Sequence, residues 1–405
     1  MKIAFLLGEF PIISETFIVS QITTLLDLGH EVEIFALRRS KDNKIHEDVK
    51  KYNLIEKTHF INVPENKAIK LIKAFYLLFI NFYKNPINLL KSFNFIKYGK
   101  FAFSLNLFYT GIAFYNYMNY FDIIHAHFGQ RGVIGIYLKE MGAKGRLATT
   151  FYGGDVNEKY KNGYKYLFKK GNLFIVNNNF KKNKLIELGC YPKKIVVIPT
   201  GVFLEKFIFS RKKIKKNEKI KILSIGRLVE KKGIKYAILA IADIVKNYKK
   251  IEYKIVGDGI LRVQLEGLVK RLNLEKYVRF LGYCTQEEYI KLYKNSHIFL
   301  SPCVTASNGD SDQSLVNQEA QAMGLPVIST LHNGIPEGVL DKRSGFLVPE
   351  KDYKAIAEKL DYLIKNPQKW SEMGRAGSNF IKNRYNQKEL SLKLIGLYKS
   401  CLRNI

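Results

Sequence analysis

Two basic side chains at the end of an apolar run give this sequence its first chemical signal. In SIGRLVEKKG (224–233), Arg227 follows the apolar run directly, and Lys232 lies five residues later, before a predicted helix. The free N–H groups and the dipole at a helix N-terminus attract anions. Arginine can chelate phosphate oxygens, whereas lysine acts as a point charge. The segment therefore predicts a phosphate site, although a solvated basic loop fits the same residues.

A carboxylate in a later segment can complete such a site. Segment 308–330 begins with a loop rich in Gly, Asp and Ser and continues into a predicted helix that carries Glu319. About one and a half turns into that helix, the carboxylate can hold vicinal sugar hydroxyls; the alternative is an exposed helix carboxylate. Backbone N–H groups at the start of the helix can face a phosphate. They belong to Ser314, Leu315 and Val316.

A third turn, VGDGIL (256–261), follows another apolar run. Gly257 suits a tight turn that needs a positive φ, and a structural role is the favoured interpretation. The functional alternative is that the backbone of this turn lies close to a nucleotide base.

The first half of the chain has polar residues in equivalent places. Ligands of open parallel sheets bind at the carboxyl ends of the strands, so residues that directly follow an apolar run are candidates. Gly8 and Glu9 follow the first run and would place a closely approaching backbone opposite the phosphates that Arg227 and Lys232 hold. Three side chains after later runs should rim the same cleft: His127, Tyr152 and Asp155. A single histidine at a strand end is more often structural than catalytic.

These residues must be positioned by two series of strands that alternate with helices. Short apolar runs rich in Ile, Val and Phe predict strands buried on both faces, and the stretches between them fit crossover helices. The first series comprises residues 2–8, 31–37, 122–127, 147–151, 172–178 and 194–202. The second comprises residues 219–227, 252–258, 278–282, 297–302, 325–330 and 345–349. The pattern predicts an α/β protein with two doubly wound parallel sheets, joined by the Lys-rich stretch 210–219.

The composition of the chain narrows the function classes. It has 66 basic and 36 acidic residues, a formal net charge of +30. Such a surface can attract nucleic acid, an anionic membrane or anionic substrates, and a Lys-rich proteome also explains it. Nucleic acid is disfavoured because the lysines are dispersed and no known module is present. The four cysteines lack metal-ligand spacing and are expected to be reduced thiols of a cytosolic protein.

Residues 66–121 differ from the rest of the chain. They contain no acidic residue, and seven lysines between Lys67 and Lys100 are interleaved with aromatic residues. This composition predicts an amphipathic surface that lies on anionic lipid, with ordinary core packing as the alternative. The uncharged run 101–121 reaches transmembrane length, but its polar residues and its position inside the first strand series disfavour a span.

Several motifs, taken in order, resemble those of the family-4, or group 1, retaining glycosyltransferases, and most closely the branch that builds exopolysaccharides such as colanic acid. They are FPIISETFI (10–18), HAHFG (125–129), TFYGGD (150–155), LIELGCYPKKIVVIPTGVFLEKF (185–207), SIGRLVEKKG, VGDGIL, EAQAMGLPVIST (319–330) and NGIPEGV (333–339). The resemblance implies a GT-B fold, in which two Rossmann-like domains face a central cleft. The acceptor domain would comprise residues 1–207 and a helix over 387–405 that crosses back to it. The donor domain would comprise residues 208–386.

The resemblance also assigns roles to the site residues. Arg227 and Lys232 would neutralise the donor diphosphate without a metal ion or other cofactor, and Glu319 would hold the nucleotide ribose. The family's first motif glutamate should lie eight residues earlier, where this chain has Ser311; Asp312 is one residue closer to Glu319. Tyr152 replaces the histidine that contacts the donor sugar, and a tyrosine keeps its proton near pH 7, so it cannot act as a base.

The expected activity is retaining hexosyl transfer from a nucleotide-diphosphate sugar, with UDP as the favoured nucleotide. The acceptor would be a surface-glycan precursor of exopolysaccharide, capsule or lipopolysaccharide, or another lipid-linked oligosaccharide. The enzyme would be cytoplasmic and peripheral at the inner face of the cell membrane. The alternative is a non-catalytic GT-B protein that binds a nucleotide sugar or partners another transferase, motivated by Ser311 and Tyr152.

Overall fold

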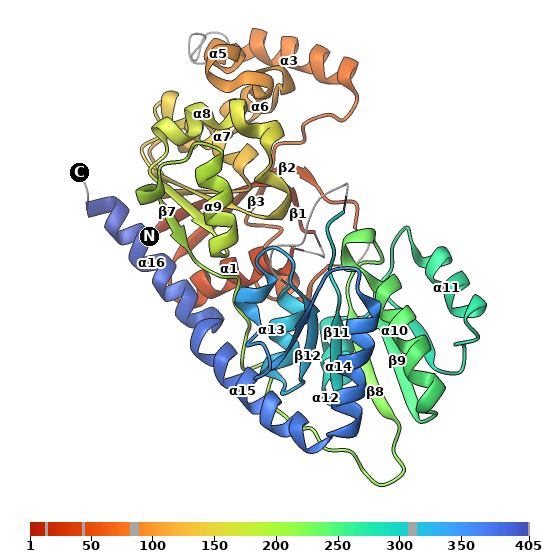
Figure 1. Cartoon of the computed structure of the whole chain (residues 1–405). Helices are drawn as coiled ribbons and strands as arrows, with labels where there is room; N and C mark the ends of the chain where they lie inside the picture. Colours follow the sequence, from red (N-terminus) through yellow and green to blue (C-terminus); the bar gives the residue numbers. More distant parts are fainter. Residues whose placement is uncertain (13–14, 43–44, 82–88, 307–313, 404–405) are drawn as a thin grey trace. The chain divides into compact units, whose positions relative to one another are not determined.

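A computed structural model describes residues 1–12, 15–42, 45–81, 89–306 and 314–403. The chain forms two compact units (Figure 1). Unit 1 comprises Met1–Pro199 and Leu390–Ile405, and unit 2 comprises Thr200–Glu389. Unit 1 is therefore built from two separate pieces of sequence, and unit 2 is inserted between them.

The sheet of unit 1 is parallel throughout. Among the described residues its strand order is β3-β2-β1-β4-β5-β6-β7. The strands are β1 (Lys2–Phe10), β2 (Glu31–Arg39), β3 (Thr58–Phe60), β4 (Ile123–His127), β5 (Arg146–Phe151), β6 (Leu173–Val176) and β7 (Ile195–Val197). Each predicted run of the first series contains a strand. Strand β3 was not predicted, because its three residues THF are only half-buried and give no apolar run.

Both faces of this sheet are covered by helices. Ala4 and Leu6 of β1 point into a cluster that also contains residues of α6 (Asn106–Phe114), α7 (Gly129–Glu140) and α8 (Lys161–Lys170). The alternate residues Ile3, Phe5 and Leu7 pack against α1 (Thr16–Asp27) and α16 (Gln387–Arg403) on the other face. Shorter or more peripheral helices are α2 (Glu47–Lys51), α3 (Lys67–Asn81), α5 (Phe95–Tyr98) and α9 (Asn179–Glu187).

The uncharged run 101–121 is part of this helical layer. It is divided among the 3-10 helix Gly99–Ser104, α6 and a second 3-10 helix, Tyr115–Tyr117. Leu107, Phe108 and Phe114 of α6 are buried in the core of unit 1. None of the described helices is long and apolar enough to cross a membrane.

Unit 2 repeats the same architecture. In its described part the strand order is β10-β9-β8-β11-β12-β13, again parallel. The strands are β8 (Ile220–Ile225), β9 (Ile251–Val256), β10 (Val278–Gly282), β11 (Ile298–Ser301), β12 (Val327–Thr330) and β13 (Gly345–Val348). The helices are α10 (Ile234–Asn247), α11 (Arg262–Arg271), α12 (Gln286–Asn295), α13 (Leu315–Ala322), α14 (Tyr353–Lys365) and α15 (Gln368–Arg384). All six predicted runs of the second series contain a strand.

The Lys-rich stretch 210–219 is not the expected linker, because it belongs to unit 2. Lys212 is buried, and its Nζ donates to the carbonyl oxygens of Tyr293 at 2.8 Å and Lys294 at 3.0 Å, at the C-terminal end of α12. Burial lowers the pKa of Lys212 to about 8. The unit boundary lies earlier than the expected position after residue 207, since Val202 and Phe207 are buried in the core of unit 2.

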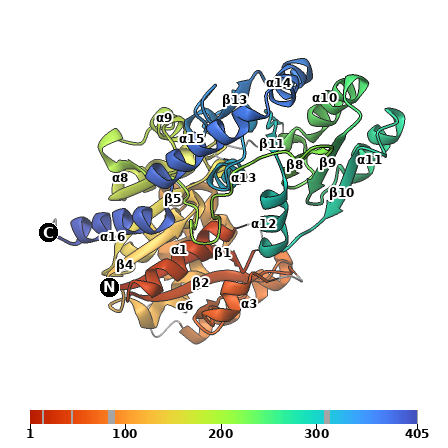
Figure 2. The same cartoon turned by 90° about the horizontal axis from the view of Figure 1, so that it is seen from below.

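Helix α16 returns to unit 1, as expected for the GT-B fold. Figure 2 shows it beside α1, and its residues Leu394, Ile395 and Tyr398 share a buried cluster with residues of α1. The Tyr398 hydroxyl is hydrogen-bonded to Nδ1 of His125 at 2.6 Å, and Nε2 of His125 is bonded to the Thr150 hydroxyl at 2.7 Å. Burial lowers the pKa of His125 to about 3, so the ring is neutral and joins α16 to β4 and β5.

We therefore expect Tyr398→Phe to weaken the attachment of α16. The substitution leaves a buried ring nitrogen of His125 without a partner, which costs about 1–3 kcal/mol. Urea unfolding, followed by circular dichroism, should show a lower midpoint. Tyr76→Phe, at a 63% exposed position on α3, is the control and should leave the midpoint unchanged. Equal midpoints for the two variants would contradict this role of Tyr398.

Candidate functional site

Each sheet has one place where the strand order reverses direction, and ligands of doubly wound folds bind at the strand ends there. In unit 1 this point lies between β1 and β4, and in unit 2 it lies between β8 and β11. The predicted site residues at these places are Gly8 and Glu9 near the end of β1, His127 at the end of β4, Arg227 and Lys232 after β8, and the residues from Ser314 to Glu319 after β11. Tyr152 and Asp155 instead follow β5, and Gly257 follows β9.

In unit 2 the two predicted cations lie in the loop that follows β8. Arg227 is exposed, and Lys232 is half-buried at the end of the 3-10 helix Glu230–Lys232. The aliphatic part of Lys232 lies beside Gly226, where an added Cβ would be 3.6 Å from its Cδ. Within the described ranges, neither cation has an acidic partner. The described residues therefore leave the charge of both cations uncompensated.

Two glycines let the surrounding loops pack closely. Gly233 has a φ of 63°, and a Cβ there would lie 1.8 Å from the carbonyl oxygen of Pro302, which follows β11. Gly257 has a φ of 124°, and its Cβ would lie 2.1 Å from the carbonyl oxygen of Gly226. The loops after β8, β9 and β11 consequently form one packed cluster. The backbone packing of Gly257 accounts for this residue without a nucleotide.

Glu319 is buried in α13, so the alternative of an exposed helix carboxylate is wrong. Its Oε2 accepts a hydrogen bond from the Tyr293 hydroxyl at 3.1 Å. Burial raises the pKa of Glu319 to about 8, and the hydrogen bond from Tyr293 opposes that shift. Without ligand, the carboxyl group is therefore mostly protonated at neutral pH.

The start of α13 lies beside β11. Ser314 is the residue before the helix, and its hydroxyl lies 3.4 Å from that of Ser301 at the end of β11. Leu315 and Val316 form the first turn, where backbone N–H groups have no partner within the helix. Ser311 and Asp312 lie outside the described residues.

In unit 1, the buried His127 and the half-buried Tyr152 form a hydrogen-bonded pair at the ends of β4 and β5. Nδ1 of His127 and the Tyr152 hydroxyl are 2.9 Å apart. Burial, and then the neighbouring His125, keeps the pKa of His127 well below its usual value, so the ring is neutral. Burial also raises the pKa of Tyr152 well above its usual value. Tyr152 thus keeps its proton and can position groups only as a hydrogen-bonding partner.

Asp155 is buried and bonded to the backbone. Its Oδ2 accepts from the N–H of Gly129 at 2.6 Å and its Oδ1 from the N–H of Tyr152 at 2.7 Å. Burial raises the pKa of Asp155 to about 7. The carboxyl group joins the loop after β5 to the start of α7, so Asp155 orients Tyr152 rather than rimming an open surface.

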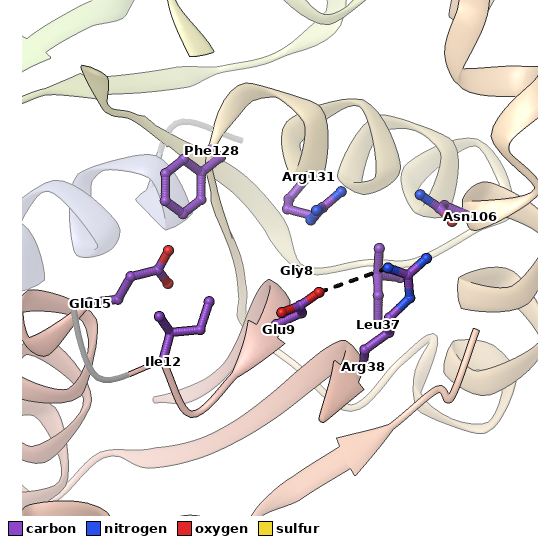
Figure 3. A pocket seen from close by; sticks show the side chains of 9 residues that line it. All are labelled: Gly8, Glu9, Ile12, Glu15, Leu37, Arg38, Asn106, Phe128 and Arg131. Atoms are coloured by element: carbon purple, nitrogen blue, oxygen red, sulfur yellow. Dashed lines mark ion pairs between the residues drawn. The ribbon is translucent and has the colours of Figure 1, made fainter. Parts of the chain in front are cut away.

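Gly8 and Glu9 line a pocket of about 240 Å³ in unit 1 (Figure 3). Phe128 lies between β4 and α7 with a φ of 72°, which is uncommon for a bulky side chain and places it at the pocket wall. The full lining consists of Gly8, Glu9, Ile12, Glu15, Leu37, Arg38, Asn106, Phe128 and Arg131. We call this the unit 1 pocket.

The charged residues of the unit 1 pocket other than Glu9 were not predicted from the sequence. Arg131 is two residues after the HAHFG motif and lies in the first turn of α7. A basic side chain so close to a predicted strand end could have been identified as a candidate anion ligand. Glu15 was inside the FPIISETFI motif, but nothing in its spacing indicated burial. Arg38 and Asn106 could not be connected to Gly8 before the strand order and the position of α6 were known.

Comparison with known proteins agrees with this architecture. The family model described as Glycosyltransferase Family 4 matches residues 14–206, and that described as Glycosyl transferases group 1 matches residues 205–380. The putative colanic acid biosynthesis glycosyltransferase WcaL of Salmonella typhimurium is 34% identical over 369 residues, which cover 89% of this chain and 90% of the relative. The chain belongs to the family 4, or group 1, glycosyltransferases.

A further relative and two solved structures extend the comparison. The amylovoran biosynthesis glycosyltransferase AmsK of Erwinia amylovora is 36% identical over 88% of this chain and 89% of its own length. A glycosyltransferase from Rickettsia africae superposes with a TM-score of 0.73 at 19% identity, covering 100% of this chain and 99% of that one. Anabaena HepE in complex with UDP superposes with a TM-score of 0.74 at 16% identity, covering 99% of this chain and 100% of that one. The expected GT-B fold and colanic-acid type of branch are confirmed.

The raised pKa of Glu319 predicts how stability depends on pH. The unfolded carboxyl group has a pKa near 4.3, so between about pH 4.5 and 8 the folded state holds a proton that the unfolded state has released. This group therefore destabilises the folded state progressively as pH rises through that window. Glu319→Gln, which cannot ionise, should be more stable than the unsubstituted protein by roughly 1–4 kcal/mol at pH 8, and this difference should shrink to about 1 kcal/mol or less at pH 5.

Denaturant unfolding at both pH values, without nucleotide, measures this difference. Glu358→Gln removes a carboxylate whose side chain is 71% exposed and serves as the control, with little change expected at either pH. The raised pKa would be contradicted if the difference in the free energy of unfolding between Glu319→Gln and the unsubstituted protein were the same at pH 5 and pH 8.

Proposed function

We propose that this protein is a retaining glycosyltransferase that moves a sugar from a UDP-sugar to a precursor of a surface polysaccharide. The observation that carries the proposal is the pair Arg227 and Lys232, which have no acidic partner in the described chain and follow β8 where the strand order of unit 2 reverses. The names of the WcaL and AmsK relatives support a role in exopolysaccharide biosynthesis. The UDP complex of Anabaena HepE supports UDP as the nucleotide.

In the proposed reaction, Arg227 and Lys232 hold the diphosphate of the donor. Negative charge grows on the diphosphate as its bond to the sugar breaks, and preorganised cations lower the energy of that transition state. The backbone N–H groups of Ser314, Leu315 and Val316 would add donors at the start of α13. We propose that these groups balance the charge without a metal ion.

Retention of configuration requires the acceptor to attack from the face that the diphosphate leaves. In this proposal a departing phosphate oxygen takes the proton of the acceptor hydroxyl, so no side chain has to act as a base. Tyr152 fits that scheme, because burial raises its pKa and the hydroxyl stays protonated beside His127. Its role would be to position the sugar.

Glu319 would bind the ribose of the nucleotide. Two vicinal hydroxyls that donate to its carboxylate favour the charged form, whereas burial in the free protein favours the neutral form. Nucleotide binding would then release a proton from this group below about pH 8. The hydrogen bond from Tyr293 fixes the orientation of the carboxyl group beforehand.

Donor binding and turnover test the proposal. Arg227→Met and Lys232→Met should each weaken UDP binding at least tenfold by isothermal titration calorimetry, because a charged hydrogen bond contributes about 1.5–3 kcal/mol. Arg271→Met, at an exposed site near the end of α11, is the matched control and should bind UDP normally. Single-turnover assays with a panel of UDP-, GDP- and ADP-sugars and a lipid-linked acceptor, with EDTA, should show product of retained configuration.

Two results would count against the proposal. Unchanged UDP affinity in Arg227→Met and Lys232→Met would show that these residues of unit 2 do not bind the donor. Tight donor binding with no transfer to any lipid-linked acceptor would instead favour the alternative, a non-catalytic protein that binds a nucleotide sugar. Ser311→Glu and Tyr152→His would then be compared for a gain of turnover.

We also propose that α3 holds the protein at the inner face of the cell membrane. Its inner side packs through Ala74 and Leu78 against the core of unit 1. Its outer side exposes large apolar residues between basic ones: Ile69, Leu71, Ile72, Phe75, Tyr76 and Phe79, of which Phe79 is 83% exposed. An apolar face flanked by lysines suits insertion among anionic lipid headgroups, where a lipid-linked acceptor is located.

Vesicle cosedimentation tests the membrane surface. The double variant Phe75→Ser and Phe79→Ser should lose most binding to vesicles that contain phosphatidylglycerol, with unchanged thermal stability because both positions are exposed. The control Ile260→Ser and Val263→Ser removes apolar residues that are 79% and 80% exposed in unit 2. Equal vesicle binding by both double variants would exclude α3 as the contact.

A further inference from the structure

The unit 1 pocket contains a basic side chain, Arg131, with a buried donor that has no partner among the described residues. Arg131 projects from the first turn of α7, and its Nε is buried without a hydrogen-bond partner. In the part of the chain that the structure describes, its guanidinium also forms no ion pair. Arg131 as a whole is half-buried, and a partly desolvated cation without a counter-ion is stabilised when a ligand supplies negative charge.

The backbone makes room for this guanidinium. Gly8 lies at the end of β1, and a Cβ added there would be 2.7 Å from Nη2 of Arg131. Any larger residue at this position would displace the arginine side chain. Gly8 therefore shapes the unit 1 pocket around Arg131.

The two carboxyl groups of the pocket attract Arg131 from nearby, but neither forms an ion pair with it. Glu9 pairs with Arg38 across 3.8 Å, and Nε of Arg38 also donates to the Val63 carbonyl oxygen at 3.1 Å (Figure 3). Glu15 forms no ion pair with Arg131, and burial raises the pKa of Glu15 to about 7. Since Glu15 is only partly ionised at neutral pH, the pocket keeps an excess of positive charge.

Further groups at the pocket suit a sugar ring. Lys70 of α3 donates to Oδ1 of Asn106 at 3.0 Å and adds positive charge behind it. Asn106 and Glu15 can form hydrogen bonds to hydroxyls, and Phe128 offers an apolar surface. At about 240 Å³, the pocket has room for one monosaccharide with a charged substituent.

We infer that the unit 1 pocket binds an oxyanion of the acceptor glycan, a sugar carboxylate or a phosphate, with Arg131 as its main anchor. The inference rests on the proposed transferase function and adds the chemical class of the acceptor. The diphosphate of the donor already has Arg227 and Lys232 in unit 2 as proposed partners. Arg131 lies in unit 1, so we assign it to a second anion.

Small probes test this inference on the full chain. Ligand-observed NMR would compare methyl glucuronide and glucose 1-phosphate with neutral methyl glucoside. The charged probe that carries the right oxyanion should bind about tenfold more tightly than methyl glucoside, as expected for one charge-assisted contact. Preference for the glucuronide would identify a carboxylate, and preference for glucose 1-phosphate would identify a phosphate.

Substitutions then assign the preference to Arg131. Arg131→Met should abolish the preference for the charged probe, and Arg131→Lys should keep part of it. Arg39 is an exposed neighbour of Arg38, and Arg39→Met should leave the preference intact. Thermal melts check that each variant is folded, and the comparison of Arg131→Lys with Arg131→Met separates charge from packing. UDP affinity should be the same in all variants.

Two outcomes would overturn the inference. The first is equal binding of charged and neutral probes by the unsubstituted protein. The second is a loss of UDP affinity in Arg131→Met as large as the loss of probe affinity, which would assign the pocket to the donor. A protein that bound no UDP-sugar but still preferred a charged probe would refute the proposed function and leave the pocket assignment standing.

Discussion

Every strand of both described sheets is parallel to its neighbours, and the rest of the structure follows from that constraint. Parallel strands require a crossover between each pair, so helices cover both faces, and the central strands are mostly buried and apolar. The carboxyl ends of the strands then lie at one edge of each sheet. In unit 1 the end of β1 lies beside the loop after β4, which brings Gly8 to Arg131. In unit 2 the loops after β8 and β11 lie side by side, which brings Gly233 to Pro302 although the two are distant in sequence.

The fold was predictable from the sequence because burial on both faces leaves a strong apolar pattern. Twelve of the described strands coincide with predicted runs, and only the short, half-buried β3 gave no such signal. Stretch 210–219 was misinterpreted because its lysines indicated a solvated linker. Lys212 is buried instead, since the carbonyl oxygens at the end of α12 accept hydrogen bonds from its Nζ, and no pattern in the sequence reveals such a partner.

The candidate sites were predictable only where residues near in sequence act together. Arg227 and Lys232 lie in one loop, so their spacing was informative. Glu319 was recognised as a candidate, but its burial depends on Tyr293 and on packing in unit 2. The unit 1 pocket draws on β1, β2, α6 and α7, and its charge balance depends on which carboxyl group faces which guanidinium. That information exists only in three dimensions.

The division of unit 1 into two pieces of sequence has a consequence for folding during synthesis. Unit 2 is one continuous segment, Thr200–Glu389, whereas the core of unit 1 lacks Leu394, Ile395 and Tyr398 until α16 has left the ribosome. Domains generally fold as units during translation, in order of completion. Here the unit that begins first is completed last. The nascent chain must therefore keep the apolar face of β1 and β4 that awaits α16 from aggregating throughout the synthesis of unit 2.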